Sequence, residues 1–206
     1  MSTPPEPKTS PLLLVLSAPS GAGKTTMARR LLMEVPNTLF SVSYTTRDPR
    51  GAEKDKVDYC FVDVASFQRK IDRGEFVEWA QVHDHFYGSP RSVIDDARQV
   101  NGVAVFDIDV QGGTAIKAQY PEAVLIFIVP PSMEELERRL RSRATDTEET
   151  ITRRILAARN EMSRGTASYD YIIINDELEG AFAVLKAIVT AERARRGRVD
   201  VRSLRL

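Results

Sequence analysis

A glycine-rich segment near the start of the chain has the residue types and spacing for phosphate chemistry. It reads Ala18-Pro19-Ser20-Gly21-Ala22-Gly23-Lys24-Thr25, and it follows the apolar run Leu12–Leu16 and precedes the helix-forming stretch Thr26–Glu34. Glycines let successive backbone N–H groups converge on phosphate oxygens, and the positive end of the following helix points at the same place. Lys24 adds a charge for the β- and γ-phosphates, and the Thr25 hydroxyl can ligate Mg²⁺. The segment predicts a nucleoside triphosphate site.

This site alone leaves the reaction open, because an ATPase, a GTPase or a kinase could use it equally well. The motif departs from the strict pattern at its first position, where Ala18 replaces the usual glycine. A loop that merely turned a strand into a helix would not need Lys24, so we favour the phosphate-binding interpretation.

Alternating elements along the chain must position this loop. Four short apolar runs have the character of strands buried on both faces of a parallel sheet. They are Leu12–Leu16, Val103–Phe106, Ala123–Val129 and Tyr169–Ile174. Ser132 and Glu135 form a capping-box pattern that opens a helix over Met133–Arg143, and an apolar stripe predicts a second helix over Thr147–Arg164, with Gly165 placed to end it. The alternation predicts an α/β fold of the P-loop NTPase type, with a parallel sheet flanked by helices.

The stretch 40–89 breaks this alternation. It is richer in aromatic and β-branched residues, and its shorter runs, Tyr59–Val64 and Phe76–Val82, predict a small, partly antiparallel insertion. Residues 1–11 contain four prolines and little to bury, so we expect a loose leader. We therefore expect one domain over residues 12–196, followed by an arginine-containing tail, 197–206.

Composition narrows the possible partners. The 206 residues include 29 basic and 29 acidic side chains. This balance disfavours nucleic acid or an anionic membrane surface as a partner, but not a small anionic ligand. One cysteine, Cys60, cannot form an internal disulfide, and no signal-peptide pattern or membrane-length apolar run is present. We expect a cytoplasmic protein, either a monomer or a homodimer.

Further motifs follow the loop in a fixed order. They are Ser41–Arg50 followed by Glu53, then Val57–Val62, Gly74–Ala80, Tyr87–Ser89, Asp107–Gly112, Arg143 with Asp146–Glu149, and Asn175–Asp176. Together they closely resemble the guanylate kinase family, in its order and spacing, over nearly everything from Leu12 to about Arg196. The resemblance implies transfer of a phosphoryl group from ATP to GMP, with dGMP as a further substrate and Mg²⁺ as cofactor, in guanine nucleotide synthesis and recycling. It also implies an ATP-holding core (12–39, 90–132 and 165–196), a GMP-binding insertion (40–89) and a helical lid (133–164).

Arginine side chains are expected where the phosphate of the acceptor nucleotide binds. A nucleoside monophosphate carries nearly two charges at one end, and planar guanidinium groups can hold it bidentately. By resemblance, Arg47 and Arg50 bind the GMP phosphate, with Tyr59 and Tyr87 donating hydroxyls. Outside this context, such an arginine pair is more often a solvated surface feature.

A carboxylate is expected where the base of the acceptor nucleotide binds. Guanine presents N1–H and an exocyclic amine, and a carboxylate facing these two donors selects it over adenine. Glu78 is the candidate, and by resemblance Ser43 and Ser89 also contact the base. Without the resemblance, Glu78 would be interpreted as the polar side of an edge strand.

The Mg²⁺ ligands and the arginines of the lid complete the expected site. Asp107 follows a buried strand, where ligands bind in this fold class, and can hold a Mg²⁺ water shell together with Thr25. By resemblance, Asp109 matches a position near the acceptor base and the metal, and the sequence alone does not divide the roles between Asp107 and Asp109. An aspartate here could instead cap the next helix. By resemblance, Arg143 and Arg154 join Lys24 and Arg47 as catalytic residues. By resemblance, Asn175 matches a position near the adenine of ATP, and Thr26 with the loop completes the ATP site.

Two other interpretations and two departures remain. Scaffold domains that resemble this family bind proteins through the acceptor site, but typically lack an intact phosphate loop. A relative acting on a sugar phosphate or another nucleotide would leave Ser43 and Glu78 unexplained. Ala52 and Lys56 stand where the family usually has glycine, and would strain the backbone by about 1 kcal/mol if either needs a positive φ.

Overall fold

A parallel sheet forms the centre of the molecule in the computed structural model, which describes residues 10–142 and 147–199. The strands are β1 Leu12–Ser17, β2 Thr38–Ser41, β3 Tyr44–Thr45, β4 Cys60–Phe61, β5 Phe76–Val82, β6 His85–Pro90, β7 Val103–Asp107, β8 Val124–Val129 and β9 Tyr171–Ile174. The helices are α1 Lys24–Glu34, α2 Val64–Asp72, α3 Ser92–Gln99, α4 Val110–Gln119, α5 Met133–Arg141, α6 Glu148–Ser168 and α7 Leu178–Arg193. The central sheet has the order β2-β7-β1-β8-β9, with every pair parallel. The predicted fold class is confirmed.

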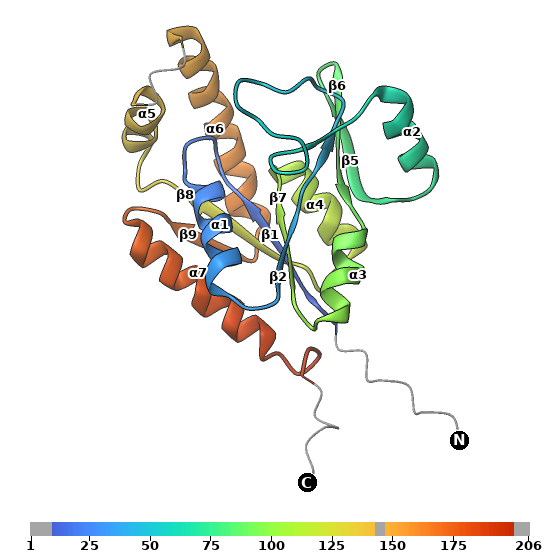
Figure 1. Cartoon of the computed structure of the whole chain (residues 1–206). Coiled ribbons are helices and arrows are strands. Elements are labelled where there is room, and N and C mark those ends of the chain that lie inside the picture. The colour runs from blue at the N-terminus through green and yellow to red at the C-terminus, as the bar shows by residue number, and fades with distance from the viewer. Residues whose placement is uncertain (1–9, 143–146, 200–206) are drawn as a thin grey trace, which may run out of the picture.

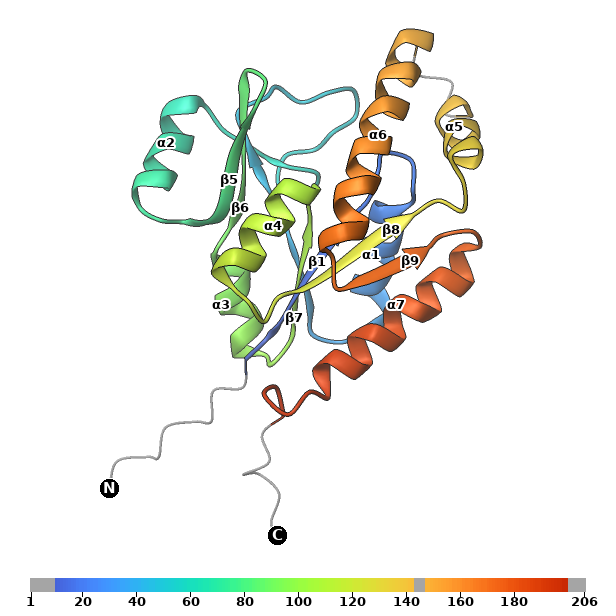
Figure 2. The ribbon, with the colours of Figure 1, turned by 180° about the vertical axis from the view of Figure 1, so that it is seen from behind.

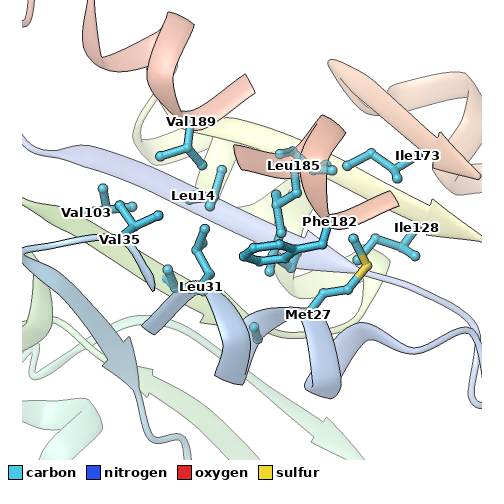
Figure 3. Packing of buried hydrophobic residues seen from close by; sticks show 14 of the residues in the cluster. Leu14, Met27, Leu31, Val35, Val103, Ile128, Ile173, Phe182, Leu185 and Val189 are labelled. Atoms are coloured by element: carbon cyan, nitrogen blue, oxygen red, sulfur yellow. The ribbon is translucent and has the colours of Figure 1, made fainter. Parts of the chain in front are cut away.

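The inner strands β1, β7 and β8 are buried on both faces, which explains their continuous apolar runs. The edge strand β9 is covered on one face only, since Ile172 and Ile174 are 48% and 62% exposed, so the predicted burial of this run on both faces is wrong. Along β1, Leu14 faces α1 and α7 while Val15 faces α3 and α4. On the first face, Met27 of α1 packs with Phe182 and Leu185 of α7 (Figure 3). On the other face α6 covers β8 as well (Figure 2). This two-sided core fixes the carboxyl ends of β1 and β7, where the loop and the acidic residues lie.

The insertion has its own sheet, in the order β4-β3-β6-β5. Strands β5 and β6 form an antiparallel hairpin, and β3 pairs parallel with β4. The predicted strand over Tyr59–Val64 is wrong beyond Phe61. The Asp63 side chain accepts the Ser66 N–H at 2.6 Å, which ends the extended segment and begins α2. The insertion is therefore a mixed β/α unit, as expected, with a helix that begins at Val64, the last residue of the predicted strand.

Helices α5 and α6 stand on the opposite side of the sheet's carboxyl edge from the insertion (Figure 1). The Ser132 hydroxyl accepts the Glu135 N–H at 3.1 Å, so the predicted cap is confirmed. Gly165 does not end α6, which continues to Ser168. A Cβ at Gly165 would lie 2.5 Å from the Phe127 ring, so this glycine serves close helix–sheet packing instead.

Three expected boundaries differ from the observed elements. Strand β2 extends to Ser41 because its last residues pair with β7, so the central sheet reaches past residue 40. Helix α6 likewise crosses residue 164. The tail is partly docked: Arg198 is 8% exposed and donates to the Glu192 carboxylate at 2.7 Å and to the Glu122 carbonyl at 2.6 Å. The expected leader lies mostly outside the described residues.

Across the described residues, none of the helices combines the length and apolar character needed to span a bilayer.

Candidate active site

The phosphate loop joins β1 to α1 through backbone conformations that need glycine. Gly21 and Gly23 both have φ near +95°, and Gly23 is the residue before the first turn of α1. Ala18 is not among the described non-glycine residues with positive φ, so the missing first glycine leaves the loop unstrained. The first turn of α1 contains no acidic residue, so its N–H groups face the loop without a competing carboxylate. The local geometry is that of an anion-binding turn.

Lys24 and Thr25 meet Asp107 across the ends of β1 and β7. Lys24 Nζ lies 2.5 Å from Asp107 Oδ1 and donates to the Ile108 carbonyl oxygen at 3.1 Å. Thr25 Oγ1 donates to Asp107 Oδ2 at 3.3 Å. Sequence positions more than 80 apart are thus brought together because β1 and β7 are neighbours in the parallel sheet. We call Lys24, Thr25 and Asp107 the donor corner.

Asn175 supports the loop from behind. It is 5% exposed, and its side-chain amide donates to the Ala22 carbonyl at 2.7 Å. A Cβ on Gly23 would lie 2.3 Å from the same amide nitrogen. The structure therefore gives Asn175 a direct contact with the backbone of the phosphate loop.

An open cleft of about 870 Å³ joins the donor corner to the insertion. Its lining includes most of the predicted acceptor residues: Ser43, Tyr59, Glu78, Tyr87 and Asp109. Arg47, Arg50, Ser89 and Arg154 are not part of this lining as far as the chain is described. The cleft is thus bounded by phosphate-binding groups at one end and by a carboxylate at the other.

Arg47 is held by a residue to which the sequence gave no role. Both terminal nitrogens of Arg47 donate to the Glu53 carboxylate at 2.9 Å, and Nη1 also donates to the Asp48 carbonyl. The hydrogen bonds with Arg47 lower the pKa of Glu53, and Glu53 in turn raises the pKa of Arg47. Glu53 also accepts the Arg50 N–H at 2.7 Å and lines the cleft. Its presence in the motif after Arg50 was the only signal that could have identified it.

Glu78 lies beside the two predicted serines. Ser89 Oγ donates to Glu78 Oε1 at 2.6 Å, and the Ser43 and Ser89 hydroxyls are 3.5 Å apart. Burial raises the pKa of Glu78, and the Asp109 carboxylate adds to this, while the Ser89 hydrogen bond opposes it. Gly112 lets this carboxylate approach α4, since a Cβ there would lie 3.3 Å from Glu78 Oε2.

Asp109 lines the cleft and also caps α4. Its carboxylate accepts the Gly112 N–H at 2.8 Å, so the helix-capping alternative describes Asp109, whereas Asp107 faces Lys24. Ser41, at the end of β2, was assigned no role from the sequence, yet it lines the cleft and is 3% exposed. Its hydroxyl has no hydrogen-bond partner in the described part of the chain.

The lid helices carry many arginines, and the three described arginines of α5 are in local ion pairs. Arg138 pairs with Glu135, and Arg141 pairs with Glu137. Arg139 donates to the Asn175 carbonyl at 3.0 Å, which ties α5 to the loop's support. Of the two predicted lid residues, Arg154 is half-buried in α6, and Arg143 lies outside the described residues.

The donor corner suits Mg²⁺. Thr25 and Asp107 offer hard oxygen ligands 3.3 Å apart. Within residues 10–142 and 147–199, no group of three or more His, Cys, Asp or Glu side chains could hold a metal ion. The Thr25 and Asp107 oxygens suit an ion that takes its remaining ligands from phosphates and water, as Mg²⁺ does in phosphoryl-transfer sites.

A phosphate loop on a parallel sheet, facing a cleft with a second set of polar groups, defines a nucleotide-binding protein of the P-loop class. A family model described as guanylate kinase matches residues 10–192. Guanylate kinase from Myxococcus xanthus is 67% identical over 195 residues, covering 95% of this chain and 93% of that protein. The Anaeromyxobacter dehalogenans guanylate kinase is 54% identical, covering 95% and 87%.

A crystal structure of guanylate kinase from Anaplasma phagocytophilum gives a TM-score of 0.75 at 37% identity, covering 95% of this chain and 94% of that one. The chain belongs to the guanylate kinase family.

Proposed function

We propose that this protein transfers the terminal phosphoryl group of ATP to GMP, producing ADP and GDP. The observation that carries the proposal is the single cleft that joins the donor corner to Glu78. A simple ATPase or GTPase would need only the donor corner, whereas a kinase needs a second polar site within reach of it. A catalytically inactive binding module would have no use for Lys24 and Thr25 placed against Asp107.

At the donor end, the loop N–H groups bind the ATP phosphates and Lys24 neutralises charge on the transferred group. Thr25 and Asp107 would hold Mg²⁺, which supplies charge neutralisation between the phosphates when bound. Lys24 has three N–H donors, two of which are used by Asp107 and Ile108. The third is left for a phosphoryl oxygen.

At the acceptor end, Glu78 accepts hydrogen bonds from guanine N1–H and the exocyclic amine, with Ser43 and Ser89 beside it. Arg47 and Arg50, with the hydroxyls of Tyr59 and Tyr87, bind the GMP phosphate. Glu53 already fixes the guanidinium of Arg47, so this group would meet the phosphate in a set orientation. Asp109 lines the same cleft.

The lid, residues 133–164, would close over ATP and bring Arg143 and Arg154 to the transferred phosphoryl group. Closure excludes water, which would otherwise accept the phosphoryl group and waste ATP. Leu140 of α5 lies 3.1 Å from the position that a Cβ would take at Gly21, so the first helix of the lid already contacts the phosphate loop in this structure. The proposal extends to dGMP as a substrate and to cytoplasmic action, in line with the bacterial relatives.

A coupled assay of ADP release tests the function directly. The purified protein is given ATP and Mg²⁺ with GMP, AMP, CMP or UMP in turn. We expect turnover with GMP and little with the other three, because each lacks the pair of donors that Glu78 accepts. Equal turnover with AMP and GMP would refute the role of Glu78, and no turnover with any acceptor would refute the kinase function.

A further inference from the structure

Ser17, the last residue of β1, is fully buried and its hydroxyl is the middle of a chain of hydrogen bonds. Tyr169 Oη donates to Ser17 Oγ at 2.6 Å, and Ser17 Oγ donates to the Ile108 carbonyl oxygen at 2.7 Å. Lys24 Nζ donates to the same oxygen at 3.1 Å. A carbonyl oxygen has two lone pairs, so Ser17 and Lys24 together use both.

Tyr169 is held firmly at the far end of this chain. It follows α6 directly, and its ring packs edge-on against Phe127 with the ring centroids 5.5 Å apart. A Cβ at Gly113 would lie 2.2 Å from its hydroxyl oxygen, so the glycine leaves the space that the hydroxyl occupies. Burial raises the pKa of Tyr169 to about 12, so the hydroxyl remains a donor even at alkaline pH.

The Ile108 carbonyl belongs to the peptide group between the two acidic residues of the site. Ile108 N donates to the Leu16 carbonyl at 3.2 Å, which fixes the preceding peptide group to β1. Ser17 fixes the following peptide group, which leads into Asp109. Both peptide groups after Asp107 are therefore bound to the strand that leads into the phosphate loop.

Lys24 depends on this carbonyl for its position. Its ammonium is shared between Asp107 and Ile108, which are on the same side of the loop. With the Ile108 oxygen free to rotate, the strong attraction to Asp107 would dominate and draw the ammonium away from the transferred phosphoryl group. A small displacement of such a group lowers the rate of transfer more than it lowers substrate affinity.

We propose that Ser17 and Tyr169 are positioning residues for Lys24. This chain of hydrogen bonds fixes the Ile108 carbonyl, and this oxygen sets the direction of the Lys24 ammonium. Neither residue lines the described cleft, so each acts through Ile108 rather than by touching the nucleotide. This inference rests on the phosphotransfer proposed above.

The test compares Ser17→Ala, Tyr169→Phe and the double variant with the parent protein. Tyr171→Phe is the matched control. Tyr171 lies two residues after Tyr169, outside the cleft lining, and its hydroxyl also donates one hydrogen bond, to Glu192 at 2.7 Å. For each protein, kcat and the KM values for ATP and GMP come from the coupled assay, GMP affinity from calorimetry and stability from thermal unfolding. Turnover of the parent is measured first, so that failure of the kinase function is separated from failure of this inference.

We expect kcat to fall about five- to tenfold in Ser17→Ala, the loss of roughly one hydrogen bond, and about threefold in Tyr169→Phe. The dissociation constant for GMP should change less than about twofold, and the double variant should be no slower than Ser17→Ala, because Tyr169 acts through Ser17. Tyr171→Phe should lose stability without losing kcat. Multiplying effects in the double variant, or an equal loss of kcat in Tyr171→Phe, would overturn the proposal. If Ser17→Ala does not fold, the comparison of Tyr169→Phe with Tyr171→Phe decides it alone.

Discussion

Replacing Glu78 with glutamine tests the base-selecting site with little change of shape. Glu78 Oε1 accepts the Ser89 hydroxyl at 2.6 Å, so in Glu78→Gln the amide oxygen stays at this position and the NH₂ group takes that of Oε2. One N–H donor of guanine then faces the NH₂ group of the glutamine, which is also a donor. Losing one hydrogen bond to a charged group costs about 1.5–3 kcal/mol, which lowers kcat/KM for GMP roughly 10- to 150-fold. AMP should lose far less, because the adenine edge offers an acceptor to the new NH₂ group.

The same variant makes a prediction about stability and pH. Because burial raises the pKa of Glu78, the folded protein binds more protons than the unfolded chain from the ordinary pKa of 4.5 up to the raised value. The free energy of unfolding therefore falls as pH rises through this window, and stays lowered above it. Glu78→Gln has no buried charge at this position and avoids the loss of unfolding free energy. Without nucleotide it should therefore melt at an equal or higher temperature than the parent at pH 7.5. In the parent, GMP affinity should be lost as pH falls through the raised pKa.

The acceptor panel and thermal unfolding, run at pH 7.5, check both expectations. A Glu78→Gln protein that keeps GMP turnover within threefold of the parent would refute the base-reading role. A melting temperature several degrees lower would refute the electrostatic argument, because it would mean that the charged carboxylate stabilises the empty site.

Four further variants test other parts of the structure. Lys24→Ala should remove most turnover while calorimetry finds GMP affinity nearly unchanged; lost affinity would contradict the division between donor and acceptor ends. Gly165→Ala should lower the free energy of unfolding by about 1–3 kcal/mol in urea, because its Cβ would meet Phe127 at 2.5 Å. Lys56→Gly should raise that free energy by up to about 1 kcal/mol, since Lys56 has φ of 61°, and an unchanged value would mean that no strain is present. Ser41→Ala should leave stability equal or higher, and a loss above about 1 kcal/mol would reveal a partner for the hydroxyl.

Much of this protein follows from local sequence patterns. The phosphate loop depends on Gly21, Gly23 and Lys24, which are close in the chain, and the buried strands show themselves as apolar runs because both faces of a parallel sheet are covered. The Ser132 cap is equally local. The sequence identified Ala52 and Lys56 as departures from the family pattern within the insertion, but only the structure shows which one has a strained backbone. Lys56 has a positive φ, whereas Ala52 is not among the described residues with a positive φ.

Tertiary structure decided the contacts between distant segments. Gly165 has the residue type of a helix end, but the Phe127 ring from another element determines its role. The sequence motif contains both Arg47 and Glu53, but a loop sequence does not fix which charged side chains meet, so their ion pair was visible only in the structure. Ser17 and Tyr169 are 152 positions apart and have no periodicity that connects them. Local pattern specifies which segment is a strand, a helix or a loop, whereas hydrogen bonds between segments depend on how the sheet orders its strands, and no residue pattern within a single segment encodes that order.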